Sequence, residues 1–385
     1  MTFEKLVMEE ALDAIIDYRG RTPQKSPIGI STVSAKSVKN GQIDYSECYY
    51  ISPEEYKKFM TRGFPQKGDI LLTTEAPLGM VAKLDRADVA VAQRLLTLRG
   101  KKGVLDNDFL MYYLQSSEGQ GLLKAKETGT TVTGIKQAEF RKIVIKVPDF
   151  QTQKKIAAIL SALDEKIAIN RAINDNLEQQ AAALFSSLYD RSNTEVGFTD
   201  LIQILGGGTP KTGENTYWNG NIAFFTPKDV GTPYTLITEK TISKEGLSHC
   251  NSRLYPVNTV FVTARGTVGK VGMSGVPMAM NQSCYALVGK ETHQLLVYFY
   301  TLKAVDRLKH KASGAVFDAI TTRDFESEQI MKLSDDDATA FLRVAEPMFQ
   351  EVLNNNIENL RLSTLRDSLL PKLMSGEIDV SAVQL

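Results

Sequence analysis

Hydrophobic side chains recur at heptad spacing in a long segment that follows Pro148. Successive apolar positions lie three or four residues apart, and Asn170 and Asn174 occupy two places in the same series. This spacing is typical of a helix that packs against another helix along a narrow seam. The apolar positions of the predicted seam are Ile156, Leu160, Leu163, Ile167, Leu177, Ala181, Leu184 and Leu188.

The same series returns 185 residues later, with Asn355 and Asn359 in place of the first two asparagines. A seam asparagine lowers stability but fixes register and pairing. We therefore predict an antiparallel helix pair about a local two-fold axis, with all four asparagines meeting near its middle. The alternative is two amphipathic helices, each docked only on its own domain. Pro347 should kink the second helix or mark its start. The remaining positions of the second series are Phe341, Ala345, Met348, Val352, Leu362, Arg366, Leu369 and Leu373.

The segments outside the helices also repeat. Residues 68–81 resemble residues 258–271, and both read as an apolar strand, a polar turn, a glycine and a second strand. Collinear matches at similar offsets indicate two copies of one domain rather than a chance likeness. The matched positions are Thr22/Thr209, Pro23/Pro210, Lys36/Lys228, Val38/Val230, Thr73/Thr263, Gly79/Gly269, Val81/Val271, Gly129/Gly314, Ile135/Ile320 and Phe140/Phe325.

The repeat predicts an α+β fold class. Two similar α/β domains would be joined by two long α-helices that form an antiparallel coiled coil, with pseudo-two-fold symmetry. The predicted segments are a first domain at 1–149, a central helix at 150–192, a second domain at 193–333, and a C-terminal helix with its tail at 334–385.

Charge is uneven although the 385 residues carry 45 basic and 45 acidic side chains and no net charge. The two globular segments carry +3 and +2, the central helix 0, and the C-terminal segment −5. This polarity allows a phosphate-facing surface on each domain. No run of about 18 apolar residues predicts a membrane span, and Cys48, Cys250 and Cys284 form no CxxC pair, so a cytoplasmic location is expected.

Known catalytic motifs are missing. The chain has no phosphate-binding loop, dinucleotide fingerprint or HExxH pair, no GxSxG elbow, and no tetrapeptide of the kind that holds a flipped base. The glycine-rich loop at 206–208 lacks a following Lys-Ser and meets Pro210. We therefore predict a non-catalytic, two-headed binding protein with neither catalytic residues nor a metal site.

Basic and amide side chains in predicted loops, together with the carboxylate of Glu75, are the candidate DNA contacts. Arginine reads guanine edges, Asn and Gln read adenine, and lysine commonly meets phosphate. Glu75 and Arg265 are aligned but opposite in charge, so the two domains should read different sequences if that loop touches bases. The candidates are Arg19, Arg21, Lys25, Lys36, Lys39, Glu75, Gln93, Arg94 and Lys136 in the first domain, and Lys211, Lys228, Arg265, Lys270, Asn281, Gln282 and Arg323 in the second.

Several stretches resemble the specificity subunits of type I restriction-modification enzymes. The opening of the second domain resembles a target recognition domain, and two helical stretches resemble the family's central and C-terminal helices. The first domain has Thr22-Pro23 but no Tyr-Trp after it. The stretches that carry the resemblance are Gly207–Pro210, Tyr217–Gly220, Thr226–Val230, Gln153–Ile156, Leu160–Ile167 and Leu365–Ile378.

The resemblance implies a DNA sequence-recognition subunit. Each domain would read one half of a bipartite, asymmetric site on double-stranded DNA, and the helices would set the spacer. About 39 helical residues span roughly 58 Å, and lengthening them should widen the gap between half-sites. Two methyltransferase (M) subunits and the restriction/translocase (R) subunits would be partners and would carry S-adenosylmethionine, ATP and Mg. The alternatives are a subunit of a type IIB or methylation-only complex and, in another class, a duplicated protein-protein scaffold.

Overall fold

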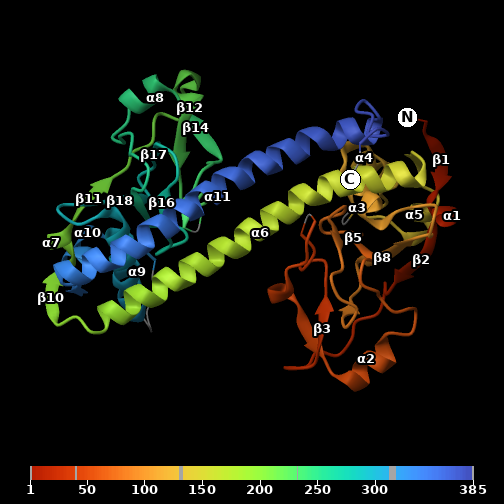
Figure 1. The fold of residues 1–385 in the computed structure, drawn as a ribbon, viewed down its shortest axis with the longest axis horizontal. Helices are drawn as coiled ribbons and strands as arrows, with labels where there is room; N and C mark the ends of the chain where they lie inside the picture. The colour runs from red at the N-terminus through yellow and green to blue at the C-terminus, as the bar shows by residue number, and fades with distance from the viewer. Residues whose placement is uncertain (1, 40, 130–132, 232, 312–317, 384–385) are drawn as a thin grey trace. The chain divides into compact units, whose positions relative to one another are not determined.

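The structure is a computed structural model that describes residues 2–39, 41–129, 133–231, 233–311 and 318–383 (Figure 1). The chain divides into two compact units. The first comprises Met1–Lys166 and Arg361–Leu385, and the second comprises Ile167–Leu360. Each unit therefore contains one globular part and a portion of both long helices. The four functional segments expected from the sequence stay a prediction.

The first unit contains a four-stranded antiparallel sheet in the order β2-β8-β5-β6 and a three-stranded sheet in the order β4-β3-β7. In the larger sheet, Leu71 lies opposite Thr97 and Ala82. A separate pair, β1 with β9, closes the globular part. Its elements are β1 (Glu4–Val7), α1 (Met8–Ala11), β2 (Leu12–Asp17), β3 (Ile30–Val33), β4 (Tyr49–Ile51), α2 (Pro53–Phe59), β5 (Ile70–Thr73), β6 (Val81–Lys83), β7 (Ala90–Val91), β8 (Leu95–Gly100), α3 (Asn107–Gln115), α4 (Ser117–Ala125), α5 (Gln137–Arg141) and β9 (Val144–Val147).

The second unit repeats this plan with one additional strand. Its sheets have the orders β11-β18-β15-β16-β13, β14-β12-β17 and β10-β19. Phe261 lies opposite Ala286 and Gly272, which matches the central position of Leu71 in the first unit. The elements are β10 (Thr194–Gly197), α7 (Phe198–Leu201), β11 (Ile202–Gly206), β12 (Trp218–Phe225), β13 (Tyr234–Thr235), β14 (Lys240–Ile242), α8 (Lys244–Ser248), β15 (Val260–Thr263), β16 (Val271–Ser274), β17 (Met278–Met280), β18 (Cys284–Gly289), α9 (Gln294–Lys311), α10 (Thr322–Glu326) and β19 (Gln329–Lys332).

Matching hydrogen bonds confirm the duplication at the level of the backbone. The amide of Met8 donates to the carbonyl of Ile143 over 2.9 Å, and the amide of Phe198 donates to the carbonyl of Glu328 over the same distance. The aligned phenylalanines Phe140 and Phe325 are both fully buried. Gly314, the predicted counterpart of Gly129, lies outside the described residues.

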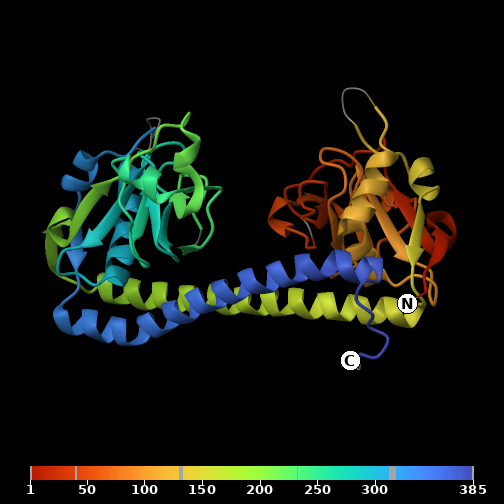
Figure 2. The ribbon, with the colours of Figure 1, turned by 90° about the horizontal axis from the view of Figure 1, so that it is seen from above.

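Two long helices complete the fold, α6 (Phe150–Tyr189) and α11 (Asp335–Ser375). Each is continuous, and within each unit their portions run side by side (Figures 1 and 2). Pro347 lies on an exposed position inside α11, so the expectation that it marks the start of the helix is wrong. The helix instead begins at Asp335, where the Ser334 hydroxyl accepts a hydrogen bond from the amide of Asp337 over 3.1 Å.

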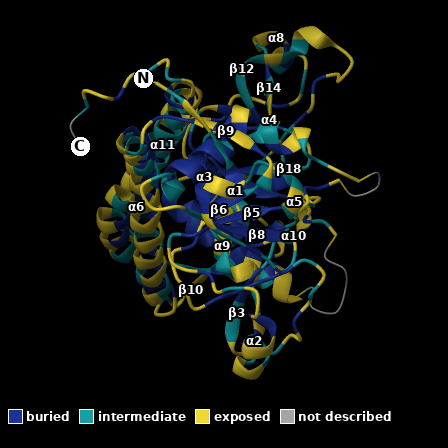
Figure 3. Ribbon diagram, turned by 90° about the vertical axis from the view of Figure 1, so that its right-hand side faces the viewer, coloured by how far each residue is buried: buried dark blue, intermediate teal, exposed yellow. Residues whose placement is uncertain are grey.

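The heptad series predicted from the sequence is confirmed by burial, because every seam position is buried or half-buried. The same side chains also enter the globular cores. Ala181 and Phe341 belong to one apolar cluster with Phe299 of α9. In the first unit, Leu160 and Leu373 share a cluster with Phe109 of α3. The helices therefore pack on each other and on the globular parts, whereas α2, α8 and the outer side of α6 are largely exposed (Figure 3).

Candidate functional site

A threonine-anchored turn occupies the same place in both units. In the first, the Thr73 hydroxyl donates to the carbonyl of Pro77 over 2.6 Å and accepts from the amide of Met80 over 2.9 Å. In the second, the Thr263 hydroxyl donates to the carbonyl of Thr267 and accepts from the amide of Lys270. These bonds fix the turn that joins β5 to β6 and its counterpart between β15 and β16.

The repeated glycine of this turn has a conformational reason. Gly79 has φ 92° and Gly269 has φ 73°, values that L-residues with a Cβ rarely adopt. A Cβ at Gly79 would also overlap the side chain of Gln120. The two turns are therefore similar in sequence because they share one backbone geometry.

Two further segments are hydrogen-bonded to the beginning of each turn, and we call the three segments together the ledge. The amide of Thr74 donates to the carbonyl of Arg94, and the amide of Ile135 donates to the carbonyl of Thr74, each over 2.9 Å. In the second unit, Ala264 donates to Ser283 over 2.8 Å, and Ile320 donates to Ala264 over 2.9 Å. Position 75 is thus equivalent to position 265, and position 94 is equivalent to position 283.

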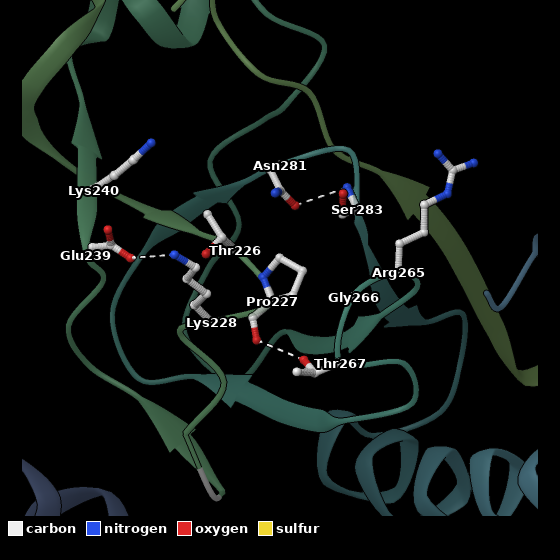
Figure 4. A pocket seen from close by; sticks show the side chains of 10 residues that line it. All are labelled: Thr226, Pro227, Lys228, Glu239, Lys240, Arg265, Gly266, Thr267, Asn281 and Ser283. Carbon is white, nitrogen blue, oxygen red and sulfur yellow. Dashed lines mark hydrogen bonds and ion pairs between the residues drawn. The ribbon is translucent and has the colours of Figure 1, made fainter. Parts of the chain in front are cut away.

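A cavity of about 510 Å³ opens beside this ledge in the second unit (Figure 4). Three cationic side chains and one carboxylate line it, so the wall favours an anionic ligand. Lys228 lies 3.8 Å from Glu239, and both side chains remain largely exposed. The amide of Ser283 donates to Oδ1 of Asn281 over 3.0 Å, which holds that side chain. The lining residues are Thr226, Pro227, Lys228, Glu239, Lys240, Arg265, Gly266, Thr267, Asn281 and Ser283.

A smaller cavity of about 230 Å³ lies beside the equivalent ledge of the first unit. Arg19 and Lys136 line it together with Glu75. Nη2 of Arg19 donates to the carbonyl of Ile135 over 2.8 Å, and Glu75 forms an ion pair with Arg94 at 2.8 Å. The structure thus brings three of the predicted residues into this cavity and places Arg94 against one of them.

Some predicted cations are occupied within the fold. Arg21 donates to the Thr61 hydroxyl over 2.6 Å and lies over the ring of Phe59 at 5.4 Å. Lys25 lies over the ring of Tyr49 at 4.9 Å. Both cations are therefore already engaged within the first globular part, which leaves them less free to bind a ligand than the sequence suggests.

The other predicted DNA contacts line neither of the two cavities. The ammonium group of Lys39 donates to the carbonyl of Lys36 over 2.8 Å, and Gln282 accepts a hydrogen bond from Thr209. A role for these residues stays a prediction. The set outside both cavities is Arg21, Lys25, Lys36, Lys39, Gln93, Arg94, Lys211, Lys270, Gln282 and Arg323.

Sequence reasoning missed Lys240, which lines the larger cavity and lies over the ring of Trp218 at 5.6 Å. Nε1 of Trp218 donates to the carbonyl of Lys211 over 3.1 Å, so the indole contacts both the loop that contains Lys211 and strand β14. The sequence signal was weak, because Lys240 belongs to a three-residue strand whose place is decided by its pairing with β12.

The four seam asparagines come together as predicted. Nδ2 of Asn170 donates to Oδ1 of Asn359 over 3.0 Å, and Nδ2 of Asn355 donates to Oδ1 of Asn174 over 2.9 Å. The residue numbers rise on one helix as they fall on the other, so the pairing is antiparallel. Exchanging each residue for its counterpart 185 positions away converts one pair into the other, which is a local two-fold relationship.

The described parts of the chain contain no cluster of three or more His, Cys, Asp or Glu side chains arranged to hold a metal ion. Among the described helices, none combines the length and apolar character needed to cross a bilayer.

Known proteins resemble this chain over most of its length. The family described as the type I restriction modification DNA specificity domain matches residues 16–179 and again residues 193–332. The HindI specificity subunit of Haemophilus influenzae is 24% identical, with 81% of this chain and 87% of the relative covered. The MjaIX specificity subunit of Methanocaldococcus jannaschii is 23% identical, covering 86% and 82%. The crystal structure of a type I restriction-modification S subunit from M. genitalium has the same fold, with TM-score 0.64, 16% identity, and 97% and 96% coverage.

Proposed function

The chain belongs to the type I restriction modification DNA specificity domain family, and from this we propose that it is the DNA sequence-recognition subunit of a type I restriction-modification complex. The observation that carries the proposal is the double match. The family matches residues 16–179 and 193–332 separately, and the structure shows two copies of one fold over the corresponding globular parts.

We propose that each globular part is a target recognition domain that reads one half of a bipartite DNA site. The two threonine-anchored turns support this, because each presents a fixed ledge beside a cavity lined by cationic side chains. Fixed backbone geometry positions a reading side chain, and surrounding cations meet the phosphates. Because the two cavities differ in their lining residues, the two half-sites should differ in sequence.

The two helices are proposed to be the spacer of this subunit. Helix α6 has 40 residues and α11 has 41, so each is about 60 Å long at 1.5 Å per residue. Their hydrogen-bonded asparagine pairs support a pairing with one register, which a spacer of defined length requires.

The proposed partners are double-stranded DNA, two methyltransferase subunits and the restriction/translocase subunits. In this assignment the chain is non-catalytic, and S-adenosylmethionine, ATP and Mg bind to the partners. The M. genitalium relative is described as the S subunit of a type I system, which supports assembly with other subunits. The local two-fold relationship of the helices supports two equivalent docking places.

Mapping of methylated adenines tests the function directly. Genomic DNA would be sequenced from cells that express this chain with its methyltransferase subunit, and from cells that express the methyltransferase subunit alone. We expect methylation of a motif with two different half-sites separated by a fixed spacer, and only when the chain is present. Methylation that does not depend on the chain, or that falls on one continuous site, would contradict the proposal.

A further inference from the structure

The two ledges differ chemically at one equivalent pair of positions. In the first unit these positions hold Glu75 and Arg94, which form an ion pair at 2.8 Å. In the second unit they hold Arg265 and Ser283. The first ledge therefore presents a paired acid and base, whereas the second presents an arginine without the equivalent carboxylate.

The Arg265 side chain is free to meet a ligand. It is exposed, and its guanidinium has neither an ion-pair nor a hydrogen-bond partner among the residues that the structure describes. Figure 4 shows it on one side of the cavity, pointing away from the other labelled side chains, with Glu239 and Lys240 on the opposite side.

The backbone beneath this side chain is held firmly. The amides of Ala264 and Arg265 donate to the same carbonyl, that of Ser283, over 2.8 and 3.3 Å. On its other side, the backbone of Arg265 forms an isolated antiparallel β-bridge with Ala319. Because the backbone of Arg265 is already fixed, little backbone entropy is lost when its free guanidinium binds a ligand, which favours specific recognition.

We propose that Arg265 selects a guanine in the half-site read by the second domain. This inference depends on the proposed function. The guanidinium offers parallel N–H donors that match the O6 and N7 acceptors of guanine in the major groove. Lys228 and Lys240, on the other side of the cavity, are the point charges suited to phosphate.

Comparison with the first domain indicates that Arg265 contacts a nucleobase rather than a phosphate. In the proposed function both domains contact DNA phosphates, so a position that binds phosphate in both domains should be cationic in both. Position 75 is a carboxylate where position 265 is an arginine, and the carboxylate of Glu75 is paired with Arg94. A position that changes charge between two domains built on one backbone has the property expected of a base-reading residue.

Transplanting the first ledge onto the second tests the inference. The R265E/S283R variant would be assembled with its methyltransferase subunit, and its methylated adenines would be mapped beside those of the wild type. We expect the motif to change at one base pair of the half-site read by residues 193–333, with discrimination for guanine falling roughly 10- to 100-fold. The other half-site should be unchanged, which shows that the variant folds and assembles.

Two companion variants keep the result interpretable. R265K retains the charge but loses the fork, and it should relax selectivity at the same base pair in competition binding to duplexes that differ only there. K228Q removes a phosphate-type contact, and it should weaken binding to all duplexes alike and lower the salt dependence. If R265E/S283R yields no methylation, the R265K competition decides the question.

The inference and the proposed function fail in different ways. If the wild-type complex methylates no bipartite motif, the proposed function fails. If the wild-type complex does methylate a bipartite motif, the inference about Arg265 is overturned when the second half-site contains no G·C pair. It is also overturned if the motif of R265E/S283R is unchanged, or if R265K discriminates as the wild type does.

Discussion

Asn174 and Asn355 are hydrogen-bonded side chains in the middle of a helix pair, with Nδ2 of Asn355 2.9 Å from Oδ1 of Asn174. They are only 4% and 6% exposed. Asn174 also donates to Oδ1 of Asn356 over 3.0 Å. Polar groups at this depth are tolerated because they satisfy each other, and that mutual requirement ties one helix to one register of the other.

Replacing these two asparagines tests whether they contribute to stability as a unit. The single variant N174L leaves the Asn355 amide buried without its partner, and should lower the free energy of unfolding by about 1–3 kcal/mol. The double variant N174L/N355L removes both partners and should recover most of that loss. Chemical denaturation of the variants measures the coupling, and N354A, exposed on the same helix, is the control. If the double variant is as unstable as the sum of its singles, the pair does not act as a unit.

A second polar contact distinguishes the two ends of the helix pair. Nη1 of Arg366 lies 2.6 Å from Oδ1 of Asp164, and the Tyr112 hydroxyl donates to the same carboxylate over 2.7 Å. The counterparts 185 residues away from Arg366 and Asp164 are apolar, Ala181 and Phe349. An ion pair therefore joins the two helices at one end, whereas apolar side chains occupy the equivalent positions at the other end.

Removing that arginine should destabilise the first unit. R366A leaves the Asp164 carboxylate without its cation, and because both groups are about 30% exposed, 27% and 31%, we expect a loss of only about 1–2 kcal/mol. Denaturation of R366A, D164A and the double variant gives the coupling energy. R361A, an exposed arginine of the same helix, should change stability by less than about 0.5 kcal/mol. Equal losses in R366A and R361A would show that the contact contributes nothing.

Glu178 should make the second unit more stable in acid than at neutral pH. Burial, with a smaller effect from Asp175, raises the pKa of the Glu178 carboxyl from 4.5 to about 7. Because the folded-state pKa is raised, the folded chain binds one more proton than the unfolded chain between these values. Stability therefore falls as the pH rises through this window.

The variant E178Q isolates this effect. It should be more stable than the wild type by about 2–3 kcal/mol at pH 8 and nearly equal to it at pH 4.5. Thermal unfolding across this pH range measures the difference, and E351Q, exposed on α11, is the matched control. A stability gain for E178Q that is the same at both pH values would show that the carboxyl does not titrate in this way.

Domain exchange should change one half-site alone. Replacing residues 193–333 with the equivalent segment of a relative leaves the first globular part intact, because each part has its own sheets and apolar clusters. We expect mapping of methylated adenines to show a new second half-site beside the original first one. Alteration of both half-sites would mean that the two parts do not read DNA independently.

Prediction from the sequence succeeded where the signal was periodic or repeated. The heptad series located α6 and α11 and placed Asn170 and Asn174 on the contact face. The repeated Gly79 and Gly269 marked turns that need positive φ. Of the two expectations for Pro347, a kink or a helix start, the start is wrong: α11 begins at Asp335, and Ala345 and Phe349 are buried on either side of the proline.

The sequence by itself determined the duplication, the paired helices and the kinds of side chain available for DNA, because these follow from local spacing and from comparison of two copies. Only the tertiary structure decided which of those side chains are free. The Arg21 side chain is hydrogen-bonded to Thr61, and Arg94 is paired with Glu75, whereas Arg265 remains exposed at the cavity. The Arg21–Thr61 and Glu75–Arg94 contacts join residues 40 and 19 positions apart in the sequence, which tertiary folding brings together and local pattern does not encode.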